Sequence, residues 1–352
     1  MKIERILLLI SLAFCGFTVS AQHPSEDNNW KVVIQDDFSS FNTAIWYKGD
    51  NNSHKSKETE EPQIYKKENA YINYDGKLVL VTRAIDTSNI CQYGTFCQYY
   101  NEGGHKYSSG MISSVASYKY GYFEIKAKLP TGQGYWPAFW LWNANKSSPD
   151  TDYWYNEIDI FEGIGCLSDS VTCNVHWNFV TPKPQEPDLH GNIDTIRAVN
   201  YSQQYHWYGV KWEPHEISWY VDRYWVRSIA NDMEGIGIQH PMRIIINSAL
   251  FPYEEKVCNT DSSNIVLPNW MLVDSVNVYQ LICHEDSVVN VVYDYDTFAY
   301  GIKKSITING ITRALTSGEN VFFKATDFIE IKKDFEVPLG SEMFLQIMEC
   351  PD

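Results

Sequence analysis

Basic residues are scarce in this chain. The sequence holds 28 Lys and Arg against 44 Asp and Glu, which gives a formal net charge of −16. No basic run or patch stands out, and proteins that bind nucleic acid need such a patch to neutralise phosphates. The composition therefore argues against a nucleic-acid partner. An acidic surface also suits a neutral polymer better than a strongly sulfated one, although a local basic groove can override the net charge.

Long apolar runs are absent after the N-terminus, so the mature chain has no candidate membrane span. At the N-terminus, Lys2 and Arg5 precede an apolar run at Ile6–Val19, and small residues follow up to Ala21. This pattern is typical of a secretory signal peptide, here residues 1–21. A bulky residue precedes Cys15, where lipidation needs a small one. We therefore predict cleavage after Ala21 and a protein that is secreted, periplasmic or held at the cell surface.

Cys and His at the spacing of a zinc site are also lacking. One of the eight cysteines, Cys15, lies in the predicted signal peptide. The other seven follow it: Cys91, Cys97, Cys166, Cys173, Cys258, Cys283 and Cys350. Export permits disulfides. Short loops that join Cys91 to Cys97 and Cys166 to Cys173 are two options, and an odd number of cysteines leaves at least one thiol.

Extended helical periodicity is missing as well. Instead, short runs that alternate apolar with polar side chains recur between turn residues, for example at residues 122–127 and 217–221. Half-buried strands have this pattern, so it predicts an all-β fold built as a two-sheet sandwich. We expect a flexible lead-in at residues 22–29 and the sandwich at residues 30–283.

The character of the sequence changes at residues 281–290, where a polar run follows the last strand of the sandwich. Beyond this run, residues 329–331, 335–337 and 343–347 have the alternation of strands. We predict a small C-terminal β domain at residues 290–352, a size that is marginal for a core of its own. Carbohydrate binding, surface attachment and structural capping all remain open as its role.

What the sequence does have is a strand-like run with three carboxylates, Glu157, Asp159 and Glu162, in a chain that is 15% aromatic. Aromatic residues also crowd the N-terminal flank of this run. Two carboxylates beside aromatic surface are what acid/base cleavage of a glycosidic bond requires. Because side chains alternate along a strand, Glu157 and Asp159 share a face, and Glu162 joins them only through a β-bulge. We therefore predict a bulge at Ile160 or Phe161.

The roles of the three acids follow from the needs of the reaction. Two glutamates on one bulged strand fit the carboxyl separation of a retaining glycosidase, about 5–5.5 Å, better than the roughly 6.5–9.5 Å of an inverting one. One carboxyl must be an ionised nucleophile and the other must hold a proton, and spacing alone leaves Glu157 and Glu162 interchangeable. Asp159 can orient the nucleophile and raise the pKa of a neighbour. A strand edge that merely carries acids is the alternative, and the apolar residues Ile158 and Ile160 argue against it.

These residues resemble glycoside hydrolase family 16. The run Glu157–Glu162 matches the longer, bulged form of the family motif, Glu-x-Asp-x-x-Glu, and Trp136–Leu141 is similar to the tryptophan-rich strand that precedes it. The run Tyr120–Lys128 is a third match. Weaker matches lie at residues 206–212, 221–222 and 273–279. Together the matches extend from Trp30 to Leu281 in the family's order.

The resemblance implies a β-jelly-roll sandwich whose concave face forms an open cleft. On that face, Glu157 resembles the nucleophile, Glu162 the acid/base and Asp159 their helper. The resemblance also implies sugar-binding roles for six residues: Trp136, Trp140, Trp142, Trp177, Asn69 and His176. Alternate residues of a strand face inward, so each of the tryptophans has an interpretation as a core residue too.

Many members of the family also carry a structural calcium. Asp274 matches the C-terminal ligand of that ion and Asp37 lies near the N-terminal one, and oxygen ligands of this kind suit calcium. The reaction itself needs no cofactor. The resemblance thus implies a structural calcium held in part by these two residues.

Two departures from the family pattern bear on the substrate. Members that cleave β-1,3-glucans usually have Gly where this chain has Asn156 and Arg where it has Met111, and Arg is a rigid group with several donors. The resemblance implies a retaining endo-β-glycosidase for β-1,3- or mixed-linkage β-glucan, for a β-galactan such as agar or porphyran, or for host galactose-containing glycans.

A transglycosylase and a non-catalytic glycan-binding protein are the alternatives, and the three acids argue against the glycan-binding protein. We expect a monomer whose partner is the polysaccharide.

Overall fold

The computed structural model describes residues 23–49, 61–85, 107–145, 153–180, 189–190, 194–197, 200–231, 238, 240–250, 265–284, 287–289, 302–308, 320–332, 337, 339–347 and 350. The predicted signal peptide lies outside these residues, as do Cys91, Cys97 and Cys258. Within the described ranges, no helix is long and apolar enough to cross a membrane.

Strands make up nearly all of the regular structure in this part of the chain, and the two helical segments are short 3₁₀ turns. In chain order, the elements are η1 (Pro24–Glu26), β1 (Trp30–Asp36), β2 (Trp46–Lys48), β3 (Gln63–Tyr65), η2 (Lys67–Asn69), β4 (Ala70–Ile72), β5 (Leu78–Ala84), β6 (Tyr107–Ser109), β7 (Met111–Ser114), β8 (Gly121–Lys128), β9 (Tyr135–Asn145), β10 (Tyr153–Gly163), β11 (Ser170–Val180), β12 (Leu189–His190), β13 (Asp194–Arg197), β14 (His206–Trp212), β15 (Glu216–Val221), β16 (Tyr224–Ala230), β17 (Arg243–Leu250), β18 (Asn269–Leu281), β19 (Ser287–Val289), β20 (Lys303–Ile308), β21 (Asn320–Ile331) and β22 (Glu342–Ile347).

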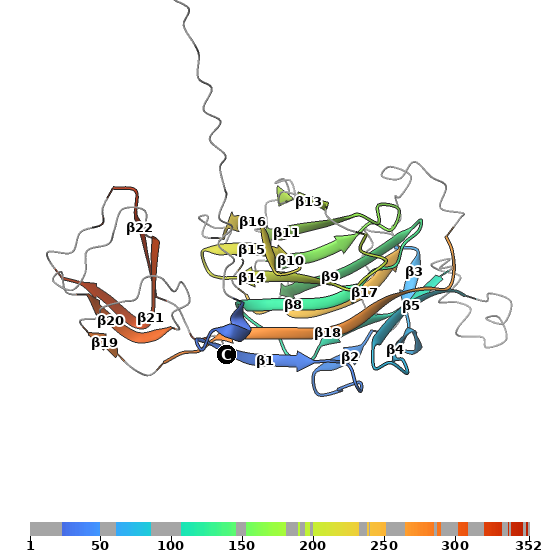
Figure 1. Ribbon diagram of the computed structural model, residues 1–352, viewed down its shortest axis with the longest axis horizontal. Helices are drawn as coiled ribbons and strands as arrows, with labels where there is room; N and C mark the ends of the chain where they lie inside the picture. Colours follow the sequence, from blue (N-terminus) through green and yellow to red (C-terminus); the bar gives the residue numbers. More distant parts are fainter. Residues whose placement is uncertain are drawn as a thin grey trace, which may run out of the picture.

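Two large sheets stack on each other and form a β-sandwich (Figure 1). The ten-stranded sheet has the order β16-β15-β14-β8-β18-β5-β6-β3, with β1 also beside β18 and β4 beside β5. The eight-stranded sheet has the order β12-β11-β10-β9-β17-β7-β2, with β13 also beside β11. Pairs in both sheets are antiparallel, apart from the parallel pair of β3 and β6. The predicted all-β sandwich is confirmed.

Side chains alternate between the two faces of each strand, and one face of each sheet is buried in a shared core. Phe123 and Ile125 on β8 have no exposed surface, and neither do Phe139 and Leu141 on β9. All four belong to one hydrophobic cluster that includes residues of both sheets. Burying a large apolar side chain stabilises the fold by about 1.5–3 kcal/mol relative to leaving it in water. The core therefore fixes which face of each strand points outward.

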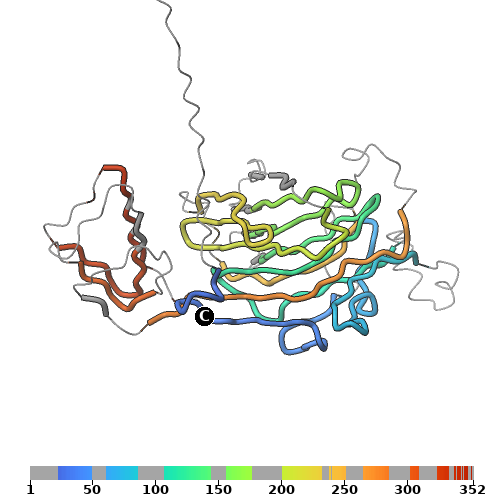
Figure 2. The backbone as a smooth tube through the Cα atoms, in the orientation of Figure 1, coloured from blue at the N-terminus to red at the C-terminus, as the bar shows by residue number. Residues whose placement is uncertain are grey.

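Strand β18 joins the ten-stranded sheet together. It pairs with β8 on one side, and on its other side with β5 along its first half and β1 along its second half. Figure 2 shows β18 in orange along the length of the sandwich, next to the blue β1. The N-terminal strand of the sandwich is therefore held in place by its last strand.

A separate four-stranded sheet follows the sandwich in the order β19-β20-β21-β22, and all of its pairs are parallel. It lies at the left of the sandwich in Figure 1. This sheet corresponds to the predicted C-terminal β domain, although its first strand begins at Ser287 rather than after residue 290. The expected strand at residues 343–347 is β22, and the one at 335–337 falls mostly outside the described residues.

A buried ion pair and a disulfide attach the C-terminal sheet to the sandwich. Lys324 of β21 contacts the carboxylate of Glu213, which also lies 3.0 Å from Nζ of Lys211. Burial alone would raise the pKa of Glu213, but the two ammonium groups lower it far below its ordinary value. Cys283, just after β18, forms a disulfide with Cys350. The ion pair thus holds the middle of the small domain, and the disulfide joins its C-terminal end to the end of β18.

The short loop between Cys166 and Cys173 does not form. Cys173 is a thiol with no exposed surface in the core of the sandwich, and Cys166 takes part in a disulfide. A buried Cys packs like a small apolar residue, which explains how a strand position inside the core can carry one.

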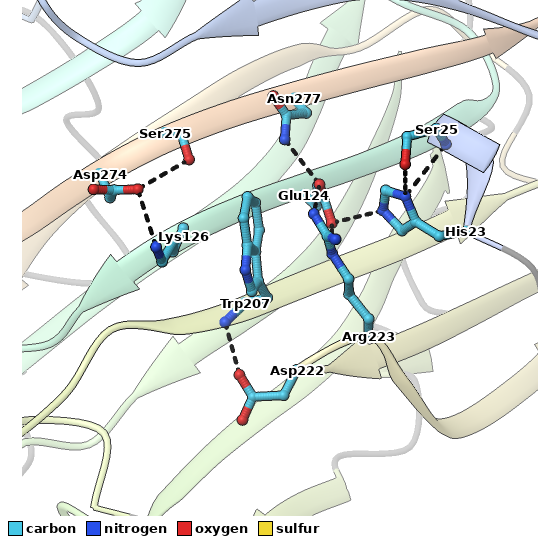
Figure 3. Close-up of polar contacts among 10 residues, drawn as sticks. All are labelled: His23, Ser25, Glu124, Lys126, Trp207, Asp222, Arg223, Asp274, Ser275 and Asn277. Carbon is cyan, nitrogen blue, oxygen red and sulfur yellow. Dashed lines mark hydrogen bonds and ion pairs between the residues drawn. The ribbon is translucent and has the colours of Figure 1, made fainter. Parts of the chain in front are cut away.

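The segment for which we predict a flexible lead-in lies, from residue 23 on, against the ten-stranded sheet. His23 precedes η1, and its Nε2 lies 3.1 Å from Oε2 of Glu124, a β8 carboxylate with no exposed surface (Figure 3). Arg223 donates to both oxygens of Glu124, at 3.0 and 3.3 Å, and Asn277 donates to Oε1 at 2.8 Å. A buried carboxylate costs several kcal/mol unless it is paired and hydrogen-bonded. The lead-in is held because it completes this set of partners.

We expect Glu124→Gln to lower the free energy of unfolding by about 2–4 kcal/mol at pH 7. Burial would raise the pKa of Glu124, but hydrogen bonds from His23 and Asn277 and the charge of Arg223 outweigh it and lower the pKa below the ordinary 4.5. A carboxyl with a lowered pKa stabilises the fold above its unfolded pKa and loses that effect as the pH falls through its folded pKa. Urea unfolding should therefore show the full difference from wild type at pH 7 and a smaller one below pH 4.5. The exposed Glu330→Gln serves as control. A loss of unfolding free energy in Glu124→Gln that does not change with pH, or that is no larger than the loss in Glu330→Gln, would contradict this account.

Candidate active site

Strand β10 contains the bulge that the three acids require. Between Asp159 and Glu162, β10 advances one residue more than its neighbour β11 does. Against β9 the register shifts between Asp159 and Phe161, which places the extra residue at Ile160. Ile160 and Phe161 both point into the core, at 2% and 0% exposure. The predicted bulge at Ile160 or Phe161 is confirmed.

Register with the neighbouring strands shows what lies beside the acids. Glu157 is opposite Trp142 on β9 and His176 on β11, and Asp159 is opposite Trp140. Side chains in register share a face of the sheet. We call the side of the eight-stranded sheet that carries these five residues and Glu162 the acid face.

The acid/base candidate Glu162 is held by an indole. Trp136 donates from Nε1 to Oε1 of Glu162 at 2.8 Å. This bond holds the carboxyl group in one orientation. Trp136 therefore acts on the carboxyl group itself, in addition to the sugar-binding role that the family resemblance implies.

The helper Asp159 lies beside His176. Nε2 of His176 lies 3.2 Å from Oδ2 of Asp159 and 3.0 Å from Nδ2 of Asn174, which neighbours it on β11. His176 was predicted to bind sugar, and this geometry gives it a role in orienting the acids. Asn174 is a member of the site that the sequence did not indicate, because strand spacing alone does not show which polar residue of β11 meets β10.

Trp219 of the other sheet holds the bulge from inside the sandwich. Its Nε1 donates to the backbone carbonyl of Asp159 at 2.9 Å, and its side chain is 1% exposed. A bulge interrupts the ladder of backbone hydrogen bonds, and an unpaired buried carbonyl costs about 1–3 kcal/mol. The indole satisfies this carbonyl. No pattern near residue 159 indicates this contact, because the two residues are 60 positions apart.

Burial raises the pKa of all three acids. For Glu157, burial is the largest cause and the negative charge of Asp159 adds to it. For Asp159, burial is again the largest cause and the charge of Glu162 adds to it. The pKa of Glu162 is raised by burial although the charge of His176 and the hydrogen bond from Trp136 oppose this. All three carboxyls therefore hold a proton more tightly than a free carboxyl does, and general acid catalysis uses a carboxyl with such a raised pKa.

The aromatic part of the acid face is anchored by a chain of hydrogen bonds. Trp140 donates from Nε1 to Oδ1 of Asn247 at 2.8 Å, and Nδ2 of Asn247 donates to the Tyr65 hydroxyl at 2.9 Å. Trp140 and Trp142 pack on a buried cluster: Tyr65, Met111 and Ile245. Met111, the position where the family resemblance implies Arg in members that cleave β-1,3-glucans, is 2% exposed. It lies against these tryptophans as an apolar support and offers no donor to a sugar.

The acid face carries four of the six predicted sugar-binding residues: Trp136, Trp140, Trp142 and His176. The side chain of Trp177 lies outside the described residues. Asn69 is 1% exposed, and its amide group donates to Ser108 at 2.9 Å and accepts from Arg83 at 3.0 Å. Its sugar-binding role stays a prediction, because both polar atoms of its side chain already have partners in the protein.

The residues predicted to hold calcium do not fit that ion. One carboxylate oxygen of Asp274 contacts the ammonium group of Lys77, and the other lies 3.4 Å from Nζ of Lys126, as Figure 3 shows for Lys126. Asp37 is exposed and accepts a hydrogen bond at 3.0 Å from the backbone N–H of Ser39. Two ammonium groups at Asp274 would repel a divalent cation. The implied structural calcium is therefore not supported at these residues.

A different group of side chains has the spacing of metal ligands. Among the residues that the structure describes, Glu157, Asp159 and His176 form the one group of three or more such side chains, with ligand atoms within 4.8 Å of one another. These are the residues that the bulge gathers for acid/base chemistry. Their proximity is accounted for by that chemistry, which needs no metal.

The fold and the acid face define a class of protein: a β-sandwich that presents a bulged strand with paired carboxylates among tryptophans. Residues 57–259 match the family described as glycosyl hydrolases family 16. This match covers more than half of the chain, and the chain belongs to that family.

Three known proteins illustrate the similarity. The endo-1,3-1,4-beta-glycanase ExsH of Rhizobium meliloti (strain 1021) is 32% identical over 180 residues, which are 51% of this chain and 34% of that protein. The keratan-sulfate endo-1,4-beta-galactosidase of Sphingobacterium multivorum is 28% identical over 211 residues, 55% of this chain and 46% of that one. The crystal structure of SCLam, a non-specific endo-beta-1,3(4)-glucanase, superposes with a TM-score of 0.57 at 25% identity and covers 73% of this chain and 93% of that one. The chain thus spans less than half of the length of the first two relatives.

We expect Glu162→Gln to lower kcat/KM on a polysaccharide by roughly 10²–10⁴-fold, because the leaving oxygen then lacks its proton donor. Wild-type activity should fall as the pH rises through the raised pKa of Glu162, since the acid form is lost. With substrates whose leaving group needs no proton, Glu162→Gln should slow the first step far less. The pH dependence of kcat/KM checks this, with Glu330→Gln on the C-terminal domain as control. An unchanged alkaline limb in Glu162→Gln would show that another group supplies the proton.

We expect chelation to leave the thermal unfolding temperature unchanged. A metal that binds only the native state stabilises it in proportion to the logarithm of its concentration, and Lys77 and Lys126 already pair with Asp274. Differential scanning calorimetry after EDTA treatment, and again in millimolar Ca²⁺, would test this. A rise in the unfolding temperature with Ca²⁺ that Asp274→Asn abolishes would restore the calcium prediction.

Proposed function

We propose that this protein is an endo-acting glycoside hydrolase that cleaves a β-glucan with retention of anomeric configuration. The observation that carries the proposal is the bulge at Ile160, which brings Glu157, Asp159 and Glu162 to one face of the sheet. The relatives named above support the substrate class, since ExsH is an endo-1,3-1,4-beta-glycanase and SCLam a non-specific endo-beta-1,3(4)-glucanase.

In the first step, the Glu157 carboxylate attacks the anomeric carbon while Glu162 gives its proton to the glycosidic oxygen. The glycosidic C–O bond breaks, the leaving sugar departs with that proton, and an ester to Glu157 forms. The bond from Trp136 to Oε1 of Glu162 keeps that carboxyl in one orientation. Asp159, which shares a hydrogen bond with Glu157, orients the nucleophile.

In the second step, water resolves the ester. Glu162 is now ionised and takes a proton from a water molecule, whose oxygen attacks the anomeric carbon and releases Glu157. Both acids return to their starting protonation states. An acceptor sugar in place of the water would give transglycosylation by the same chemistry.

A β-galactan or a galactose-containing glycan is the second candidate substrate. Met111 on the acid face favours it, because this side chain replaces the Arg that is usual in members that cleave β-1,3-glucans and packs beneath the tryptophans. The keratan-sulfate endo-1,4-beta-galactosidase among the relatives supports the same alternative. We further propose that the protein acts outside the cytoplasm as a monomer, and the predicted signal peptide supports the location.

We expect the mature protein to release reducing ends from laminarin or mixed-linkage glucan and Glu157→Ala to lose nearly all of this activity. The panel for this assay also includes agarose, porphyran, carrageenan and mucin glycans. Proton NMR of the first products should show the β-anomer, as retention demands. Activity on galactans alone would select the second candidate. Turnover that persists in Glu157→Ala would remove Glu157 from the mechanism, and binding without turnover in wild type would indicate a glycan-binding protein.

A further inference from the structure

Arg243 and Tyr47 form a pair on the acid face, away from the carboxylates. Nη1 of Arg243 donates to the Tyr47 hydroxyl at 3.3 Å, and the guanidinium carbon lies 5.7 Å from the centre of the Tyr47 ring. The second distance is within the range of about 6 Å for a cation–π contact. Arg243 is exposed and Tyr47 is 39% exposed, so solvent reaches both side chains.

Register places both residues on the same face as the acids. Arg243 on β17 is opposite Trp142 on β9, which is opposite Glu157 on β10. Tyr47 on β2 is opposite Ser113 on β7, and Ser113 is opposite Ile245 on β17. Alternation agrees, because Ile244 and Trp46, which flank Arg243 and Tyr47, are buried in the core at 0% and 1% exposure.

Strand spacing gives the distance of this pair from the chemistry. Neighbouring strands lie about 4.7–4.9 Å apart, so the backbone of Arg243, two strands from Glu157, is about 10 Å away. Tyr47 is four strands from β10, which is about 19 Å. Between them lie Trp140 and Trp142 over Ile245. A saccharide that crosses the strands from Glu157 would therefore pass over an aromatic and apolar stretch and then meet Arg243 and Tyr47.

The guanidinium group is available for a ligand. It has five N–H donors, and Tyr47 takes one of them. Within the ranges that the structure describes, no carboxylate forms an ion pair with Arg243, although the chain has a net charge of −16. The Tyr47 hydroxyl and ring hold the fork of donors in one orientation, which lowers the entropy lost when it binds acceptor oxygens.

We propose that Arg243 and Tyr47 form a distal sugar subsite, in which the guanidinium donates to oxygens of a saccharide several rings from the scissile bond and the Tyr47 ring packs against a sugar. This proposal rests on the proposed function, because it assigns the saccharide to the same face. The oxygens belong either to neutral hydroxyls or to a sulfate or carboxylate substituent. Both accept from the same planar fork, and an anionic group accepts two bonds at once.

The test measures binding and turnover with saccharides of increasing length. Calorimetric titrations use Glu157→Ala, with and without Arg243→Met, so that binding is measured without cleavage. The probes are oligosaccharides of laminarin and mixed-linkage glucan, and keratan sulfate before and after desulfation. Lys31→Met is the matched control, since it removes one exposed cation from β1 of the other sheet.

We expect Arg243→Met to weaken binding of the longest saccharides by roughly tenfold to a hundredfold, the effect of losing a hydrogen bond from a charged group. Short saccharides that reach only the acids should bind as before. In active enzyme the loss should appear in KM and leave kcat unchanged, because the subsite binds ground state and transition state alike. Tyr47→Phe, which keeps the ring and removes the hydroxyl, should give a smaller loss of the same length dependence.

The outcomes separate this proposal from the proposed function. A loss confined to sulfated chains identifies an anionic substituent as the ligand, and an equal loss with desulfated chains identifies hydroxyls. If long chains bind and are cleaved equally well by Arg243→Met and by wild type, the subsite is overturned while the enzyme stands. If no saccharide binds to any variant and none is cleaved, the proposed function fails, and the subsite fails with it.

Discussion

The site depends on one extra residue in β10. Without the bulge at Ile160, the alternation of the strand would turn Glu162 into the core and leave Glu157 without a second catalytic carboxyl on its face. Two features maintain the bulge. Ile160 and Phe161 are both buried between the sheets, and the Trp219 indole donates to the carbonyl of Asp159 where the ladder is interrupted. The hydrophobic core and the second sheet therefore determine the geometry of the acids.

The sandwich uses buried carboxylates in two opposite ways. On the acid face, burial raises the pKa of Glu157, Asp159 and Glu162, and the charge of a neighbouring carboxylate adds to this for Glu157 and Asp159. On the ten-stranded sheet and its edge, Glu124 and Glu213 are surrounded by cationic partners, and their pKa values are lowered. The physical difference lies in the partners. On the acid face, burial outweighs the effect of His176, whereas at Glu124 and Glu213 the cationic partners outweigh burial.

These structural carboxylates also hold the segments that flank the sandwich on either side in the sequence. Glu124 holds His23 and with it the lead-in, and Glu213 holds Lys324 of the C-terminal sheet. Both lie in or next to the ten-stranded sheet, so neither attachment uses the acid face.

The sequence by itself determined the features that depend on neighbours along the chain. Strand alternation predicted the two-sheet fold, the shared face of Glu157 and Asp159 and the need for a bulge before Glu162. The tertiary structure alone decided which residues from distant strands meet. The Trp219 bond to Asp159, the contact of Asn247 with Trp140, the pair of Arg243 and Tyr47 and the docking of His23 all join residues far apart in the chain. The pairing of Lys77 with Asp274 is another contact of this kind. The physical reason is that the period of a strand is a local property, whereas sheet order and register set the partners across strands.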